Sequence, residues 1–253
     1  MTTTATRGRV RVEEGTKRVR VLFAGHTIID TTHPRLVWER PYYPTYYLPL
    51  DAVDPDVLVD TGETAHSPSR GDAAIHDVVL GDQRAEGAAL VYRDGAAIAD
   101  LEGMIRLDWA AMDAWFEEDE QVYVHPRDPY TRIDVLPSSR HVRIEIDGVT
   151  VADSHRPLLL FETGLPTRYY LPKTDVRMDL LTPTSHTTKC PYKGTAEYYS
   201  LTLDGETHDN IVWWYRHPTR ESAPIAGHAC FYDERVDVYV DGERQERPDT
   251  HFA

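Results

Sequence analysis

The residues best suited to chemistry in this chain lie in one short segment, residues 188–194. Cys190 and Lys193 are three positions apart, with a proline and Tyr192 between them and a glycine directly after Lys193. This composition favours a turn that presents its side chains. A nearby ammonium group favours the thiolate form of a cysteine, so Cys190 could act as a nucleophile, with Lys193 and Tyr192 completing a candidate catalytic group. The alternative is a buried, inert Cys190 and a solvated Lys193.

Aromatic residues gather in the same half of the chain. If residues 211–215 form a strand, Trp213 and Tyr215 share one face and Trp214 lies on the other. One face must belong to a core, and the other could line a pocket, because aromatic rings offer stacking area with a polar edge. The candidate ligand-binding aromatic residues are Tyr169, Tyr170, Tyr199, Trp213, Trp214 and Tyr215.

Arg168 directly precedes the tyrosine pair at 169–170. A guanidinium group can hold a carboxylate or a phosphate with two parallel hydrogen bonds, so Arg168 is a further candidate ligand-binding residue. An internal salt bridge to Glu162 or Asp175 is the alternative.

Metal and cofactor sites are not expected. The 12 histidines form neither HxH nor HExxH, and two cysteines, Cys190 and Cys230, cannot make a four-cysteine zinc site. The chain also lacks the GxGxxG and GxxxxGKS/T loops that hold nucleotide phosphates, and the GxSxG elbow of many hydrolases. The predicted site therefore contains no metal and no cofactor.

The elements that would position these groups occur twice. Moving the sequence along itself by 123 residues places the Tyr-Tyr-Leu-Pro run at 46–49 on the same run at 169–172, without a gap. A repeat of this length matches a whole small domain rather than a solenoid unit. We predict two domains, residues 9–131 and 132–253.

The first copy offers a comparison for the candidate turn. Residues 67–71 read Ser-Pro-Ser-Arg-Gly where residues 190–194 read Cys-Pro-Tyr-Lys-Gly. The proline and the glycine that shape the turn are kept, whereas the groups that could act are changed. We therefore expect the site in the second copy, beside residues 190–194.

Short runs of β-branched and aromatic residues, each bounded by turn residues, recur in both copies and predict a mainly β, antiparallel fold. One segment differs. Trp109, Met112, Trp115 and Phe116 have a helical spacing behind an aspartate suited to an N-cap, so we predict a helix near residues 109–119. Since the second copy lacks this pattern, the helix is expected to be an insertion.

Several longer motifs of the second copy carry a family resemblance. They are Ala-Asp-Ser at 152–154, Glu-Thr-Gly-Leu-Pro-Thr-Arg-Tyr-Tyr-Leu-Pro at 162–172, Cys-Pro-Tyr-Lys-Gly at 190–194 and Ala-Gly-His-Ala-Cys-Phe-Tyr at 226–232. In this order they resemble a bacterial family called domain of unknown function 427, which also carries a nucleotidyltransferase-like label. The resemblance covers residues 132–243 and, more weakly, 9–125. It implies two tandem β-tent-like domains, each with two antiparallel sheets meeting at an angle, and we expect a pseudo-twofold axis between them.

The charge of the chain limits its partners. It has 27 basic and 42 acidic residues, a net charge of −15. Nucleic acids and anionic membranes are bound by clustered Lys and Arg, so neither is an expected partner. The N-terminal segment lacks the apolar stretch of a signal peptide, and no run approaches the ~18 apolar residues of a membrane span. We expect a cytoplasmic protein.

These features predict a small-molecule site in the second copy. One alternative is chemistry through Cys190 and Lys193, and the other is a non-catalytic module that recognises a metabolite or a peptide side chain in an aromatic pocket. A purely structural or oligomerising role is a third hypothesis, which the concentration of reactive and aromatic residues in one copy disfavours.

Overall fold

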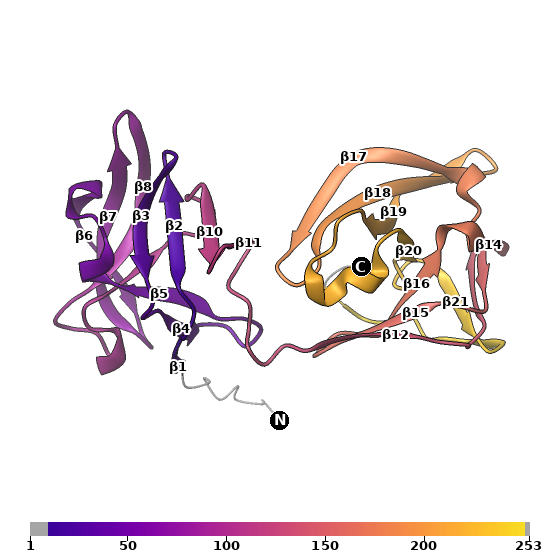
Figure 1. The fold of residues 1–253 in the computed structure, drawn as a ribbon, viewed down its shortest axis with the longest axis horizontal. Helices are drawn as coiled ribbons and strands as arrows, with labels where there is room; N and C mark the ends of the chain where they lie inside the picture. The colour runs from indigo at the N-terminus through magenta and orange to yellow at the C-terminus, as the bar shows by residue number, and fades with distance from the viewer. Residues whose placement is uncertain (1–9, 251–253) are drawn as a thin grey trace, which may run out of the picture. The chain divides into compact units, whose positions relative to one another are not determined.

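The computed structural model describes residues 10–250, and contacts divide this part of the chain into two compact units (Figure 1). One unit ends at Asp128 and the other begins at Pro129. Within the described range, no helix is long and apolar enough to cross a membrane.

The first unit contains a seven-stranded and a four-stranded antiparallel sheet, with the strand orders β1-β4-β5-β9-β8-β7-β6 and β11-β10-β2-β3. The strands are β1 (Arg11–Glu14), β2 (Val19–Phe23), β3 (His26–Thr31), β4 (Arg35–Trp38), β5 (Thr45–Pro49), β6 (Leu58–Ser67), β7 (Gly71–Leu80), β8 (Gln83–Tyr92), β9 (Met104–Leu107), β10 (Ala114–Glu117) and β11 (Glu120–Val122). The 3-10 helices are η1 (Leu50–Ala52), η2 (Pro55–Val57) and η3 (Ala99–Leu101).

The second unit has the sheet orders β12-β15-β16-β20-β19-β18-β17 and β14-β13-β21-β22. In Figure 1 its larger sheet runs from β12 at the bottom to β17 at the top, with β14 and β21 of the smaller sheet on the right. The strands are β12 (Ile133–Pro137), β13 (Val142–Ile146), β14 (Val149–Ser154), β15 (Leu158–Glu162), β16 (Arg168–Pro172), β17 (Leu181–Cys190), β18 (Gly194–Leu203), β19 (Glu206–Tyr215), β20 (His228–Phe231), β21 (Asp237–Val240) and β22 (Glu243–Arg244). The 3-10 helices are η4 (Lys173–Asp175), η5 (Met178–Leu180) and η6 (Arg220–Ile225).

Strand for strand, the second unit repeats the first. The bounds of β2 and β13, of β6 and β17, of β8 and β19, and of β10 and β21 differ by the same 123 residues at both ends. Since the strand orders match as well, the prediction of two copies of one antiparallel fold is confirmed.

The prediction of a helix near residues 109–119 is wrong. The structure has β9 up to Leu107, then turns, then β10 (Ala114–Glu117). Trp109 and Trp115 stack with their ring centroids 4.4 Å apart, and Trp115 Nε1 donates to the Trp109 carbonyl oxygen at 3.2 Å. Trp109 lies in a turn that folds back on β10, which contains Trp115, so the two rings meet without a helix. The pairing of β10 with β2 and β11 outweighs the helical spacing of these residues in the sequence. Because β10 corresponds to β21, the segment belongs to both copies and is not an insertion.

The main core of each unit lies between its two sheets. Every second residue of β2 and β13 is buried, as alternation along a half-buried strand requires. Val19 and Val21 in the first unit correspond to Val142 and Ile144 in the second, and none is more than 1% exposed. Burying each such side chain stabilises the fold by about 1.5–3 kcal/mol.

The opposite face of each larger sheet is buried as well. Tyr47 and Tyr92 in the first unit, and Tyr170 and Tyr215 in the second, belong to separate apolar clusters on this face. The segment after β8 or β19, which contains η3 or η6, contributes apolar residues to the same clusters and so covers the face. Each larger sheet is therefore the middle layer of its unit.

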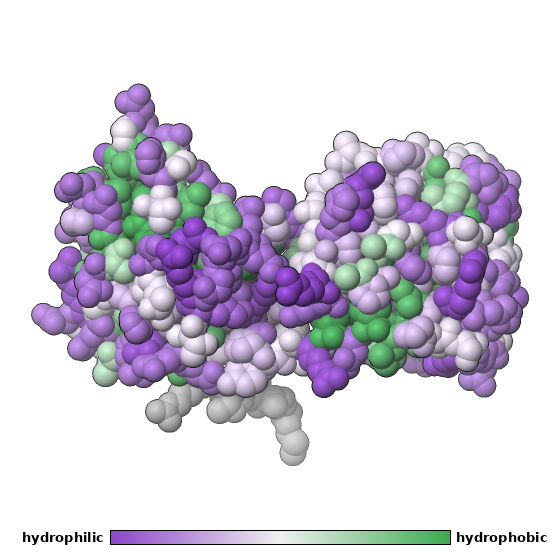
Figure 2. Space-filling view, in the orientation of Figure 1, coloured by the Kyte–Doolittle hydropathy of each residue, from purple (hydrophilic) through white to green (hydrophobic). Residues whose placement is uncertain are grey.

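The visible surface is mostly hydrophilic (Figure 2), in keeping with the 42 acidic and 27 basic residues of the chain. Hydrophobic residues gather in two areas of this view, one between β3 and β7 and one below η6. The edge strand β12 and its neighbour β15 carry the exposed apolar side chains Leu136 and Phe161. Ile133 and Val135 of β12, and Leu158 and Leu160 of β15, belong to the cluster under η6.

A glycine permits the close approach that covers this second face. Gly71 has φ of +86°, and a Cβ there would lie 2.4 Å from both Ala97 N and Gly95 O. Gly194 has φ of +99°, and its Cβ would lie 3.2 Å from His217 O. A side chain at Gly71 would clash with the covering backbone, and one at Gly194 would meet it in an unusually tight contact, so packing favours glycine in both turns.

We expect Gly71→Ala and Gly194→Ala to lower the free energy of unfolding more than Gly148→Ala does. Gly148 has φ of +78° but open space around the Cβ position, so its substitution isolates the backbone strain of about 1–3 kcal/mol. Urea denaturation of the three variants measures the difference. Equal losses would show that the close approach contributes nothing.

Candidate functional site

Arg168 forms an internal ion pair. Its guanidinium donates to both carboxylate oxygens of Glu234, at 2.9 and 2.5 Å, and lies 3.5 Å from Asp233. The side chains of all three residues are at most 10% exposed. The structure thus has the predicted internal salt bridge, but its partners follow β20 and are neither Glu162 nor Asp175.

The two acids beside Arg168 differ in their protonation. Burial raises the pKa of Asp233 to about 7, although Arg168 opposes the shift. Burial also disfavours the charged form of Glu234, but hydrogen bonds from Arg168 and Thr250 outweigh it and hold the pKa of Glu234 below its ordinary value. Asp233 can therefore donate or accept a proton near neutral pH, whereas Glu234 stays ionised as the counter-ion of Arg168.

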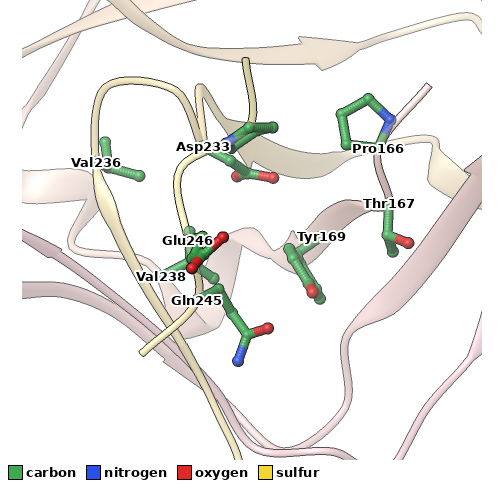
Figure 3. A pocket seen from close by; sticks show the side chains of 9 residues that line it. Pro166, Thr167, Tyr169, Asp233, Val236, Val238, Gln245 and Glu246 are labelled. Atoms are coloured by element: carbon green, nitrogen blue, oxygen red, sulfur yellow. The ribbon is translucent and has the colours of Figure 1, made fainter. Parts of the chain in front are cut away.

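A pocket with a volume of about 180 Å³ lies beside Asp233 (Figure 3). Thr167 and Tyr169 reach it from the start of β16, and Asp233 from the turn after β20. Tyr169 is the predicted ligand-binding residue among those that line it. The complete lining of the pocket is Pro166, Thr167, Tyr169, Asp233, Val236, Val238, Gln245, Glu246 and Pro248.

The first unit fills the corresponding place with a large ring. Val238 of the pocket corresponds to Trp115, which is 2% exposed and lies 6.3 Å from Tyr46 between ring centroids. Tyr46 corresponds to Tyr169. The exchange of a tryptophan for a valine was visible in the aligned copies, and it was the sequence signal for this pocket.

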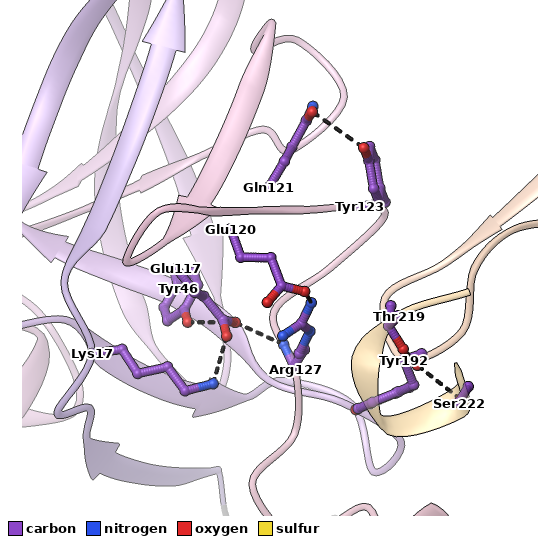
Figure 4. Close-up of polar contacts among 10 residues, drawn as sticks. All are labelled: Lys17, Tyr46, Glu117, Glu120, Gln121, Tyr123, Arg127, Tyr192, Thr219 and Ser222. Carbon is purple, nitrogen blue, oxygen red and sulfur yellow. Dashed lines mark hydrogen bonds and ion pairs between the residues drawn. The ribbon is translucent and has the colours of Figure 1, made fainter. Parts of the chain in front are cut away.

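The polar partner of the tyrosine has changed as well. Tyr46 donates its hydroxyl to the buried Glu117 at 2.9 Å, and Glu117 also accepts from Lys17 and from the backbone N–H of Arg127 (Figure 4). The counterpart of Glu117 in the second unit is Val240, which cannot accept this bond. Tyr169, which lines the pocket, therefore lacks the carboxylate partner that Tyr46 has at this position.

The turn at residues 190–194 holds the predicted catalytic group. Cys190 ends β17 and pairs with Gly194 at the start of β18. Tyr192 is 8% exposed, and its carbonyl oxygen accepts hydrogen bonds from the hydroxyl groups of Thr219 and Ser222 (Figure 4). These bonds tie the turn to the start of η6, so Tyr192 contributes to packing of the turn.

Lys193 is neither solvated nor open to a ligand. Its ammonium group pairs with Glu162, and the two side chains are 13% and 9% exposed. The first unit places Arg70 and Glu39 at the same positions, with a contact of 2.8 Å. An ion pair kept in both units indicates that Lys193 neutralises a buried carboxylate, a role that comparing the turns alone did not reveal.

Cys190 lies near the buried phenol of Tyr215. Burial raises the pKa of Tyr215 well above its ordinary value, and the Cys190 thiol adds to this effect. Burial likewise raises the pKa of Tyr170, whose hydroxyl accepts from Trp213 Nε1 at 3.1 Å. Both phenols therefore remain protonated. Cys190 itself is half-buried and forms no disulfide.

Lys173 packs against the two aromatic side chains, Trp214 and Tyr199, on the other face of the larger sheet. Its ammonium lies 3.0 Å from the Trp214 ring centroid and donates to the Tyr199 hydroxyl at 3.1 Å. Burial lowers the pKa of Lys173 to about 8. The cation and the two rings pack against each other, which explains the aromatic character of this face.

The predicted site residues therefore do not line one pocket. The alternation predicted for residues 213–215 is confirmed by burial of the first and third and partial exposure of the second. One face of the larger sheet carries Arg168, Tyr170, Trp213 and Tyr215, and the opposite face carries Tyr169, Tyr199 and Trp214.

In the described part of the chain, His141, Asp153 and His155 form a group that could hold a metal ion. One potential ligand atom from each residue lies within 4.8 Å of the others. Sequence motifs did not indicate this group because His141 is 12 positions from Asp153 in the chain, and the nearest pair in sequence is a carboxylate and a histidine.

The two units define a duplicated protein in which each copy has a large and a small antiparallel sheet. The family described as Domain of unknown function (DUF427) matches residues 11–118 and 134–242, one stretch in each unit. The chain belongs to this family, as its motifs indicated. No curated protein matches it significantly.

Substitution of Arg168 tests its assignment as an internal partner. Arg168→Met leaves two buried acids without their guanidinium, so we expect the free energy of unfolding to fall by about 3–5 kcal/mol. As a control, Arg156→Met removes the pair between Asp175 and an arginine that is 68% exposed, and should cost less than about 1 kcal/mol. Urea denaturation compares the two. A small loss for both would mean that Arg168 is available for a ligand.

Proposed function

We propose that the second unit binds a small organic molecule in the pocket formed by Tyr169, Asp233 and Glu246. The observation that carries this proposal is the exchange between the copies: Val238 stands where Trp115 fills the first unit. The pocket volume of about 180 Å³ is below the roughly 300–1,000 Å³ of pockets that enclose drug-sized ligands. The ligand is therefore a small molecule or one end of a larger one.

The chemistry of the lining favours a ligand with an amine or several hydroxyl groups. Asp233 and Glu246 supply carboxyl groups, and Gln245 and Thr167 supply neutral polar groups. None of the described lining residues is Lys or Arg. The Tyr169 ring offers a face for a cation, and the net charge of −15 attracts cationic ligands. We place this binding function in the cytoplasm.

Chemistry at Cys190 is the second candidate function. It is favoured by the position of a half-buried thiol near Tyr215 and three residues before Lys193, where the first unit has Ser67. In this hypothesis Cys190 acts as the nucleophile, and binding without chemistry is the alternative.

Val238→Trp is expected to abolish ligand binding in the pocket, because it restores the ring that fills the first unit. A panel of small amines, amides and polyols, screened by thermal shift and NMR, identifies molecules that bind the unmodified protein. Glu246→Gln should weaken the binding of amines by about tenfold, the loss of one charge-assisted hydrogen bond, and leave polyols less affected. The melting temperature of Val238→Trp without ligand controls for overpacking. Equal binding to Val238→Trp, or no binding by any of these classes, contradicts the proposal.

The first unit supplies matched replacements for the candidate catalytic residues. Cys190→Ser and Lys193→Arg install the residue types of the corresponding positions 67 and 70, so we expect the free energy of unfolding to change by less than about 1 kcal/mol. If Cys190 is a nucleophile, Cys190→Ser abolishes turnover of any substrate found in the ligand screen and preserves its binding. Full turnover by Cys190→Ser would leave binding alone as the function.

A further inference from the structure

His141, Asp153 and His155 lie together on one face of the β13–β14 hairpin. His141 Nε2 is 2.8 Å from Asp153 Oδ1, and the rings of His141 and His155 stack with their centroids 4.1 Å apart. His141 is half-buried, and the other two side chains are exposed. The three residues can therefore be reached from solvent.

Strand pairing brings these residues together. Val142 pairs with Ser154 and Arg143 with Asp153, so His141 and His155 lie one position beyond the end of the ladder on each strand. Asp153 and His155 are two residues apart and share a face of their strand. The end of the β13–β14 ladder thus brings Asp153, near the end of β14, close to the two histidines that directly flank the paired strands.

The first unit has an arginine–aspartate ion pair at the corresponding positions. Arg18, Asp30 and Thr32 correspond to the three residues, and Arg18 pairs with Asp30 through Nε at 2.7 Å. The second unit keeps the aspartate but replaces the arginine with a histidine and gains another histidine. A fixed cation beside the carboxylate has therefore been exchanged for two groups that can ligate a cation.

We propose that His141, Asp153 and His155 form a binding site for a divalent transition-metal ion such as Zn²⁺ or Ni²⁺. Imidazole nitrogens and a carboxylate suit these ions, which they bind at about 2.0–2.2 Å. Two ligand atoms of a tetrahedral zinc ion then lie about 3.3 Å apart. The pair at 2.8 Å is close to this separation, and rotation of the exposed His155 ring brings in the third ligand.

The site has three protein ligands, so further positions on the metal remain for water or a ligand. The adjacent Asp241 accepts hydrogen bonds from Arg140 Nε and from the backbone N–H of His141. These bonds hold the backbone of the first histidine in place, as supporting hydrogen bonds do around metal ligands. This site uses other residues than the Tyr169 pocket, and the two proposals can fail independently.

Calorimetry of the full-length protein without a histidine tag tests the site. After dialysis against EDTA, titration with NiCl2 or with ZnCl2 should give one bound equivalent. His141→Ala and His155→Ala should each weaken binding at least tenfold, and Asp153→Asn should weaken it less. MgCl2 should not bind, because magnesium prefers oxygen ligands.

His66→Ala is the matched control. His66 Nδ1 lies 2.6 Å from Asp72 Oδ1 in the first unit, which makes another exposed histidine–aspartate pair. Its substitution should leave metal affinity unchanged, and circular dichroism checks that every variant is folded. Absence of nickel and zinc binding, binding that persists in both histidine variants, or an equal loss in His66→Ala would overturn the proposal.

The same metal site can also be introduced into the first unit by substitution. The double variant Arg18→His, Thr32→His places the same three residue types around Asp30, so it should bind two equivalents instead of one. A folded double variant that still binds one equivalent would contradict the inference that these strand positions suffice.

Discussion

The larger sheet of each unit is buried on both faces, and this constraint explains most of the polar contacts described above. One face meets the smaller sheet, and the other meets a segment that contains only a short 3-10 helix. At the second face, the buried carboxylates of Glu39 and Glu162 each need a cation, since an unpaired buried charge is strongly destabilising. Arg70 and Lys193 supply a cation at the same position of each unit, and Glu39 pairs with Arg106 as well.

The two units have different side chains at the same place in the core between their sheets. In the first unit, Trp115 fills the end of the core and Glu117 binds the tyrosine hydroxyl. In the second unit, smaller residues stand at both places, and the buried charges have moved to Arg168 and its two acids. A change in volume and a change in charge position on one backbone are enough to open a pocket with an acidic lining.

The sequence predicted the features that depend on local pattern and on the repeat. The antiparallel fold, the two copies and the alternation of Trp213 and Trp214 all follow from turn residues and from a period of two. The inserted helix was wrong because Trp109 and Trp115 satisfy a helical spacing, whereas strand pairing decides the structure. No pattern around one residue indicates a partner that is distant in sequence.

The candidate site shows this limit most clearly. Lys193 meets Glu162 across 31 positions, and Arg168 meets Glu234 across 66. Both cations were therefore predicted to contact a ligand, although in the structure they form internal ion pairs. Two exchanges between the aligned copies do indicate these sites. The small Val238 replaces the large Trp115 at the pocket, and His141, a possible metal ligand, replaces the cation Arg18 at the histidine group.

The close approach at Gly71 and Gly194 also bears on how the chain can change in length. Surface loops usually tolerate insertions and deletions, but here the segment after β8 or β19 is held against the glycine backbone of a neighbouring turn. The covering segments differ by one residue, since residues 93–103 separate β8 from β9 and residues 216–227 separate β19 from β20. The next loops, residues 108–113 and 232–236, differ by one residue in the opposite sense, so β10 and β21 regain the offset of β2 and β13. A change of one residue in the covering segment is therefore compatible with the close approach at the glycine, provided that the next loop compensates for it, whereas the hairpin-tip glycines Gly81 and Gly205 face open space.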